Sequence, residues 1–316
     1  MLSDQSKIPF VNTEVSKRDL KYYIFDWDDN ILHMPTKIRL ERLSAGGVWE
    51  PVEVSTATYA IVRSDREHYR PPNGDWNEAF RYFEDPREKG ESNHFIEDTI
   101  AALEKVAHGE APGPSYDALR KTLREGRLFA IVTARGHSPE TIEKAVRIFI
   151  RYALSEAERV EMMSNIRGYR QWIDGVKDDE FGTDAEELDR YLGLCRYSAV
   201  AYDGFRSRMS KDPIYREKLA TLPNASCPEL AKEFAIRDFV EHVFHMLRRC
   251  GQLNRFVSIG FSDDDVANVK KVSRYIQAEL SKRFDGIKFV VYDTSDRTIS
   301  KGRKVCVSGQ QNLPGF

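Results

Sequence analysis

Short apolar runs that stop at polar residues recur along the chain and predict buried strands. These runs cover residues 21–25, 127–133, 197–202, 255–265 and 286–293. Segments with helical apolar spacing lie between them, at 95–107, 115–126, 138–154, 184–194 and 227–251. Because strands alternate with helices, the pattern favours an α/β fold with a parallel sheet between helices.

Two segments depart from this alternation. Residues 36–54 alternate apolar and polar positions around Gly46 and Gly47, which predicts a β-hairpin with a glycine turn. Residues 57–92 are polar and aromatic, and "RPPNGDW" interrupts any regular element, so this stretch is interpreted as an insertion.

Helix ends carry clear local signals. Ser115 is placed to cap the helix at 115–126, and Gly126 to end it. Ser138 followed by Pro139 is typical of a helix start. The tail after residue 300 is interpreted as a solvated terminus.

Composition narrows the class of protein. Of 316 residues, 41% are hydrophobic and 31% charged, which is typical of a packed globular protein. The 48 basic and 50 acidic residues nearly cancel, so no global field favours nucleic acid, although a local basic groove stays open. The sequence shows neither a signal peptide nor an apolar run of the ~20 residues that span a bilayer, so we expect a cytoplasmic protein without a membrane segment. Four scattered cysteines without a CxxC pair predict reduced thiols rather than a zinc site or disulfides.

Acidic and hydroxyl residues follow the predicted strands. Asp26, Thr133 and Asp263 each lie at the carboxyl end of a different strand, where α/β sheets bind ligands. Asp26 and Asp28 cannot both be buried and ionised without a partner, because desolvation and mutual repulsion oppose it. A bound cation removes this conflict, and carboxylate oxygens suit Mg²⁺. The "SDDD" run at 262–265 offers a further ligand.

Such a pair of carboxylates suits covalent phosphoryl transfer. One carboxylate attacks phosphorus, and the other protonates the leaving group and then deprotonates water. A hydroxyl such as that of Thr133 can hold a phosphoryl oxygen, and a lysine would offset the charge on the transferring group.

Three motifs in order resemble the haloacid dehalogenase (HAD) superfamily. "YYIFDWDDNIL" resembles motif I, with Asp26 and Asp28 on its two aspartates. "LFAIVTARG" looks like motif II, which ends at Thr133, and "FVSIGFSDDDVANV" is similar to motif IV. The resemblance spans roughly residues 20–295.

The resemblance implies a role for each matched residue. Asp26 would be the nucleophile that forms an aspartyl-phosphate. Asp28 would be the general acid/base and would also give its backbone carbonyl to Mg²⁺; an aspartate there favours phosphoryl transfer over dehalogenation. Thr133, Ala134 and Arg135 would contact the phosphoryl group or substrate.

Motif III is a lysine near the start of a helix. Lys232, in the first turns of the helix at 227–251, is our choice, with Lys211 and Lys218 as rivals.

Two positions depart from the family pattern. Asn30 stands where phosphatases usually have Thr or Val, but it can still make a turn hydrogen bond. In motif IV, one alignment places Phe261 on the first aspartate and Asp265 on the second, and the other makes Asp263 and Asp264 the acidic pair. We prefer Asp263 and Asp264 as metal ligands, because Phe261 then belongs to the strand.

Several residues near the three motifs have two possible roles. Trp27 is a candidate for stacking on substrate or for packing. Arg135 and His137 are candidates for contact with substrate or phosphate, or for a capping or surface role. Asp29 is expected to be an exposed turn acid. Asn268 is placed either to support the acidic pair or on the helix surface.

The resulting hypothesis is a Rossmannoid α/β protein with an HAD-like core at 20–316 and an N-terminal extension at 1–19. Residues 33–94 would form a hairpin flap and cap, and residues 154–194 a second cap-like insert that shields the site. The expected function is Mg²⁺-dependent hydrolysis of a phosphate monoester of unknown class.

Three alternatives stay open. A catalytically degenerate binding or scaffold protein would bind Mg²⁺ without turnover. A polynucleotide-end phosphatase would lose activity steeply with salt. A phosphorelay receiver gathers similar residues, but in another order and in a shorter domain.

Overall fold

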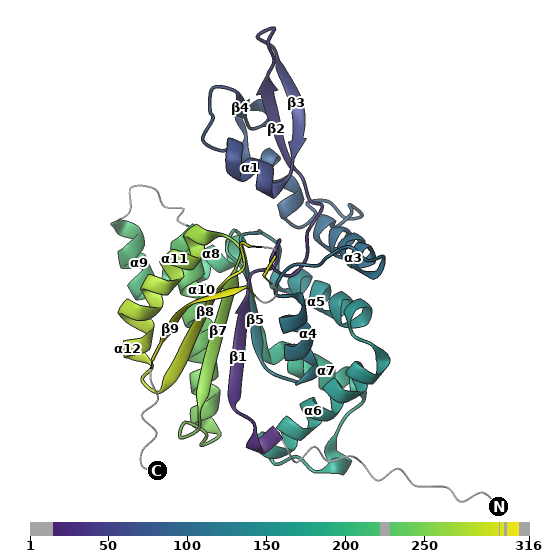
Figure 1. The fold of residues 1–316 in the computed structure, drawn as a ribbon, viewed down its shortest axis with the longest axis vertical. Coiled ribbons are helices and arrows are strands. Elements are labelled where there is room, and N and C mark those ends of the chain that lie inside the picture. Colours follow the sequence, from purple (N-terminus) through teal and green to yellow (C-terminus); the bar gives the residue numbers. More distant parts are fainter. Residues whose placement is uncertain (1–14, 222–227, 297, 300–301, 310–316) are drawn as a thin grey trace, which may run out of the picture.

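The structure is a computed structural model that describes residues 15–221, 228–296, 298–299 and 302–309. Its centre is a six-stranded sheet (Figure 1). From one edge to the other, the strands are β6 (Arg196–Ala199), β5 (Phe129–Thr133), β1 (Leu20–Phe25), β7 (Val257–Asp263), β8 (Ile287–Asp293) and β9 (Arg303–Ser308). Strands β6 to β8 run parallel, and β9 is antiparallel to β8. The prediction of an α/β fold built on a mostly parallel sheet is confirmed.

Helices cover both faces of the sheet (Figure 1). On one face lie α10 (Pro228–Arg249), α11 (Val266–Tyr275) and α12 (Ser281–Arg283), with a π-helix at Ile276–Leu280. On the other, α4 (Tyr116–Arg124) contacts β1, α5 (Pro139–Ala153) contacts β6, and α3 (His94–Ala107) packs on α5. The helices predicted at 95–107, 115–126, 138–154 and 227–251 are thus present, although Cys227 lies outside the described residues.

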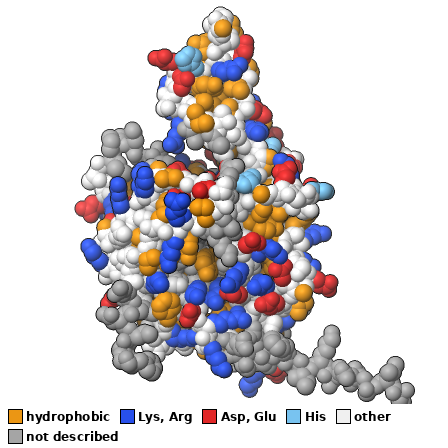
Figure 2. All heavy atoms as spheres, in the orientation of Figure 1, with side chains coloured by type: hydrophobic (Ala, Val, Ile, Leu, Met, Phe, Trp, Pro, Cys, Tyr) orange, Lys and Arg blue, Asp and Glu red, His pale blue; other side chains and the backbone are white. Residues whose placement is uncertain are grey.

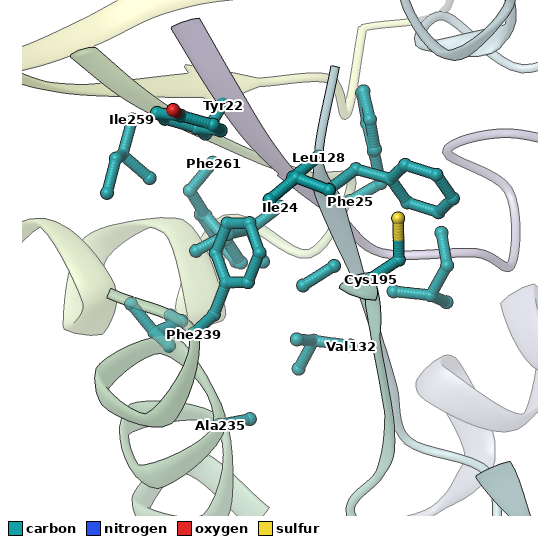
Figure 3. Packing of buried hydrophobic residues seen from close by; sticks show 14 of the residues in the cluster. Tyr22, Ile24, Phe25, Leu128, Val132, Cys195, Ala235, Phe239, Ile259 and Phe261 are labelled. Carbon is teal, nitrogen blue, oxygen red and sulfur yellow. The ribbon is translucent and has the colours of Figure 1, made fainter. Parts of the chain in front are cut away.

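The core between α10 and the sheet follows from the two-residue period of the strands. Ile24 of β1 and Ile259 and Phe261 of β7 belong to one buried cluster with Phe239 of α10 (Figure 3). Phe261 is therefore a core residue of the strand, as the preferred reading of motif IV requires.

A small cap at residues 38–83 rises above the carboxyl edge of the sheet (Figure 1). Its three-stranded antiparallel sheet and helices comprise β2 (Ile38–Leu43), β3 (Trp49–Val54), β4 (Tyr69–Arg70), α1 (Thr56–Val62) and α2 (Trp76–Ala79). Strands β2 and β3 form the predicted hairpin, with Gly47 at φ 76° in its turn. The cap buries a cluster of its own around Ile38 and Leu40, and Figure 2 shows it as a separate lobe. The stretch at 57–92, interpreted from the sequence only as an insertion, thus contains short helices and the short strand β4.

The segment at 154–194 lies at the opposite edge of the sheet and is not a cap. It forms α6 (Glu156–Asp174) and α7 (Asp184–Leu194). Asn165 donates to the carbonyl of Arg124 at 2.7 Å, and the Tyr191 hydroxyl donates to the carbonyl of Arg127 at 2.6 Å. Because Arg124 and Arg127 precede β5, these helices close the amino edge, and the predicted second cap is wrong.

Helix α6 carried a sequence signal that periodicity alone does not reveal. Ser155 and Glu158 form a capping box, in which each side chain accepts a hydrogen bond from the other's backbone N–H. Charged residues dominate its exposed side, so the apolar pattern is weak. The Ser-x-x-Glu spacing was the better indicator.

Two further expectations need correction. Ser115 precedes α4 as expected, but its hydroxyl donates to the Ser262 hydroxyl at 3.1 Å instead of capping the helix. The C-terminal tail, expected to be solvated, contributes β9, which buries Cys306 against the sheet. By contrast, Ser138 caps α5 by accepting from the N–H of Thr141, as predicted.

The remaining elements connect the layers. Helices α8 (Asp203–Lys211) and α9 (Pro213–Ala220) link β6 to the segment before α10. No helix in the described ranges is long and apolar enough to cross a membrane. Three of the four cysteines, Cys195, Cys250 and Cys306, are free thiols, and Cys227 lies outside the described residues.

Candidate active site

Parallel pairing brings two acidic motifs together at the carboxyl edge of the sheet. Phe25 of β1 pairs with Ser262 of β7, so Asp26 and Asp263 follow side by side, and the N–H of Asp26 donates to the Ser262 carbonyl at 3.0 Å. Carboxylate oxygens of Asp26, Asp263 and Asp264 all lie within 4.8 Å of one another. The sequence-predicted acids from motifs I and IV therefore form one cluster.

Lys232 completes this cluster from the first turns of α10. Its ammonium donates to Asp26 Oδ1 at 3.1 Å and to Asp263 Oδ2 at 2.6 Å, and the residue is only 3% exposed. Burial opposes the charged form of Lys232, but the two carboxylates outweigh it and raise the lysine pKa. Of the three lysines considered from the sequence, the structure brings this one to the site; Lys218 instead pairs with Glu279 on the surface.

Negative charge in the cluster exceeds what Lys232 compensates. Burial raises the pKa of Asp26 well above its usual range, with the neighbouring carboxylates adding to the shift and Lys232 opposing it. Burial, reinforced by Asp263 and Asp29, raises the pKa of Asp264 to about 7. The group of three carboxylates with one ammonium is thus poised to accept additional positive charge.

Asp28 lies beside the cluster and faces β5. Its carboxylate accepts from the Thr133 hydroxyl at 3.3 Å and from Arg135, whose Nη2 is 2.6 Å from Oδ1. Asp28 does not belong to the group of carboxylates that lie within 4.8 Å of one another. Its backbone carbonyl accepts from the N–H of Asn30 at 2.6 Å, and its expected contribution to Mg²⁺ stays a prediction.

The three residues expected to contact substrate differ in accessibility. Ala134, directly after β5, is exposed. Thr133 is buried, and its hydroxyl donates a hydrogen bond to Asp28. The Arg135 side chain is 0% exposed and forms an ion pair with the carboxylate of Asp28. The guanidinium therefore presents no surface to a ligand in this structure, and contact of Arg135 with substrate stays a prediction.

Asn30 holds the two motif strands and β8 together, a network that the sequence only hinted at. Its amide donates to the Asp26 carbonyl at 2.9 Å and to the Ser262 hydroxyl at 3.1 Å, and its carbonyl accepts from the Thr294 hydroxyl at 2.8 Å. Asn30 is fully buried. No local signal in the sequence identifies Ser262 or Thr294 as its partners.

Motif IV is organised further by Asp265 and Asn268. Asp265 caps α11 by accepting from the N–H of Ala267 at 2.7 Å, and its own N–H donates to Asp263 Oδ1 at 2.9 Å. Asn268 lies 3.4 Å from the same oxygen. Asp265 is thus used as a helix cap, and Asn268 supports Asp263.

Two residues of motif I have packing or pairing roles. Trp27 is fully buried and its ring packs against those of Phe95 and Phe149, so it does not face a substrate. Asp29, expected to be exposed, adopts φ 54° in the turn and pairs with His33 at 2.8 Å.

Two cavities lie away from this cluster. One, of about 390 Å³, lies between α4 and the side of the sheet that carries Tyr23 and Tyr292. The other, of about 380 Å³, lies at the amino edge beside α6 and α7. Neither is lined by Asp26, Asp263 or Asp264.

Comparison with known proteins identifies no relative. No family model matches the chain, and neither a curated protein nor a solved structure matches it. A function for this chain therefore rests on the chemistry of its own residues.

Proposed function

We propose that this protein is a Mg²⁺-dependent phosphatase of HAD type that hydrolyses a phosphate monoester through an aspartyl-phosphate on Asp26. The observation that carries the proposal is the carboxylate cluster of Asp26, Asp263 and Asp264 at the carboxyl edge of the sheet, whose ligand oxygens lie within 4.8 Å of one another. Lys232 bridges two of its members, Asp26 and Asp263. This edge is where α/β folds bind ligands.

The donor set of the cluster fits a hard divalent cation. Its ligand atoms are carboxylate oxygens, which Mg²⁺ prefers, and one ammonium leaves part of their charge uncompensated. Asp26, Asp263 and Asp264 would hold the ion, with the backbone carbonyl of Asp28 as a further expected ligand. When bound, Mg²⁺ would offset the negative charge of the phosphoryl oxygens.

Asp26 and Asp28 divide the chemical work. A carboxylate oxygen of Asp26 attacks phosphorus and forms a phosphorus–oxygen bond while the bond to the ester oxygen breaks. The protonated form of Asp28 gives its proton to that leaving oxygen and becomes a carboxylate. The Asp28 carboxylate then takes a proton from a water molecule, whose oxygen bonds to the same phosphorus while the bond from phosphorus to the Asp26 oxygen breaks. Inorganic phosphate leaves, and the Asp26 carboxylate is restored.

Lys232 and Thr133 prepare these two carboxylates. Lys232 fixes Oδ1 of Asp26 by a charge-assisted hydrogen bond and supplies positive charge beside the transferring group. The Thr133 hydroxyl orients Asp28 from the end of β5. The cap above this edge would exclude water and select the substrate.

A generic aryl phosphate tests the proposal. We expect the natural protein to release phosphate from para-nitrophenyl phosphate only with Mg²⁺, and Asp26→Asn to release none. Asp265→Asn is the matched control, because asparagine also caps helices, and it should retain turnover. A folded, Mg²⁺-binding protein that hydrolyses neither this ester nor a panel of phosphate monoesters would refute the proposal.

A further inference from the structure

Arg135 occupies an unusual position for a charged residue directly after a sheet strand. Its side chain is 0% exposed and lies between two aromatic rings, with the guanidinium carbon 4.6 Å from the Phe83 centroid and 4.9 Å from that of Phe95. Its Nε and Nη2 both donate to the carboxylate of Asp28, at distances from 2.6 to 3.1 Å. The planar fork of an arginine fixes a carboxylate in this way, whereas a lysine cannot.

Two linkers, 33–37 and 84–93, join the cap to the core, and the guanidinium contacts the first linker at Thr36 and the cap residue before the second linker at Phe83. Nη2 also donates to the Thr36 hydroxyl at 2.7 Å, and that hydroxyl in turn donates to Asp98 of α3. Phe83 is the last residue of the cap, and its carbonyl accepts from the N–H of Gly136 at 2.8 Å. Both linkers therefore meet at Arg135 and the residue that follows it.

We propose that Arg135 is a positioning residue that couples the orientation of the cap to the direction of the Asp28 carboxylate. This inference rests on the proposed function, in which Asp28 is the general acid/base. Nη2 of Arg135 donates hydrogen bonds to both Thr36 and Asp28. A shift of the 33–37 linker would therefore move the guanidinium group that orients the Asp28 carboxylate. Phe83, the cap residue directly before the 84–93 linker, packs against the face of the same guanidinium.

Burial separates this role from substrate binding. A residue that contacts substrate needs accessible surface, which Arg135 lacks. Loss of a substrate-contacting residue would raise KM, because it weakens substrate binding. A positioning residue acts through Asp28 and changes the chemical step, so its loss lowers kcat with little change in KM.

The test uses Mg²⁺-dependent hydrolysis of para-nitrophenyl phosphate. Arg135→Lys keeps a positive charge but loses the fork, and we expect kcat to fall by about tenfold or more while KM changes by less than about threefold. Arg135→Ala should lose more, and added guanidinium ion should restore part of its kcat. A purely structural role would give no such rescue.

Thr36→Val, which is nearly isosteric, tests the coupling. It removes the contact to Nη2 together with the hydrogen bond to Asp98, and we expect a smaller fall in kcat in the same direction. Because both residues act through one path, Arg135→Lys with Thr36→Val should be no worse than Arg135→Lys alone. Additive losses, a change confined to KM, or unchanged kinetics in an active natural protein would overturn the inference and leave the proposed function standing.

If the natural protein shows no turnover, the proposed function fails and hydrogen exchange still tests the coupling. We expect Arg135→Lys and Asp28→Asn to speed amide exchange in both linkers, 33–37 and 84–93, relative to the natural protein. Exchange unchanged in the linkers of both variants would overturn the coupling.

Discussion

The ammonium of Lys232 lies 3.1 Å from Oδ1 of Asp26, although 206 positions separate the two residues in the chain. The contact joins α10 to the end of β1 inside a region where both side chains are less than one-tenth exposed. An ion pair that is largely shielded from water therefore links the start of α10 to the end of β1.

Removal of the lysine should destabilise the fold. In Lys232→Met, Asp26 and Asp263 stay buried without their cation, and we expect the free energy of unfolding in urea to fall by about 3–5 kcal/mol, as for other broken buried ion pairs. Lys218→Met is the matched control, because Lys218 is partly exposed in its pairs with Glu279 and Glu233, and each pair should contribute less than about 1 kcal/mol. Equal losses in the two variants would contradict this assignment.

Asn30 should matter more than its partner Thr294. Asn30→Leu leaves the Asp26 carbonyl, the Ser262 hydroxyl and the Thr294 hydroxyl without Asn30, and we expect about 2–4 kcal/mol less stability. Thr294→Val removes one hydrogen bond and should lose only about 1–2 kcal/mol. Urea denaturation of both variants measures the difference, and a larger loss at Thr294 would show that Asn30 is not the centre of the network.

Mg²⁺ should stabilise the natural protein through Asp263. A site-specific ion at about 100 times its Kd adds roughly 2.7 kcal/mol to the free energy of unfolding, and EDTA should remove the gain. Asp263→Asn should lose the Mg²⁺ response, whereas Asp265→Asn, at a helix cap, should keep it. Loss of the response in Asp265→Asn alone would move the metal site to the other alignment of motif IV.

Acid should weaken the fold through His137. The imidazole is fully buried and stacks on Phe95, and burial together with Arg135 lowers its pKa from 6.5 to about 3. Below pH 6.5 the imidazole is protonated in the unfolded chain, whereas in the folded protein it stays neutral down to about pH 3. The free energy of unfolding therefore falls as the pH falls from 6.5 toward 3. The slope from this one group approaches roughly 1.4 kcal/mol per pH unit.

His137→Phe should flatten that slope. Urea unfolding at pH 7, 6 and 5 compares the variant with the natural protein, and only the difference between their slopes reports on His137. Parallel slopes would mean that His137 does not resist protonation in the folded state.

The strand ends were predictable because their signal is local. An apolar run followed at once by Asp26, Thr133 or Asp263 marks a buried strand and its polar end without knowledge of any distant residue. Parallel pairing then places the ends of β1 and β7 together, so the acidic cluster follows from the same pattern. The glycine turn of the cap hairpin was also encoded within a few residues.

The tertiary structure decided what depends on contacts between distant segments. Nothing in the residues around Arg135 indicates that Phe83, Phe95 and Asp28 enclose it, and an accessible arginine and a buried one have the same neighbours in sequence. Likewise, the charge pattern of 154–194 does not reveal which edge of the sheet its helices cover. The chain by itself therefore determined which elements form and which ends carry chemistry, because hydrophobic period and turn residues act over a few positions. Only the packed fold decided which side chains pair and which lose water, because burial and electrostatic pairing act through space.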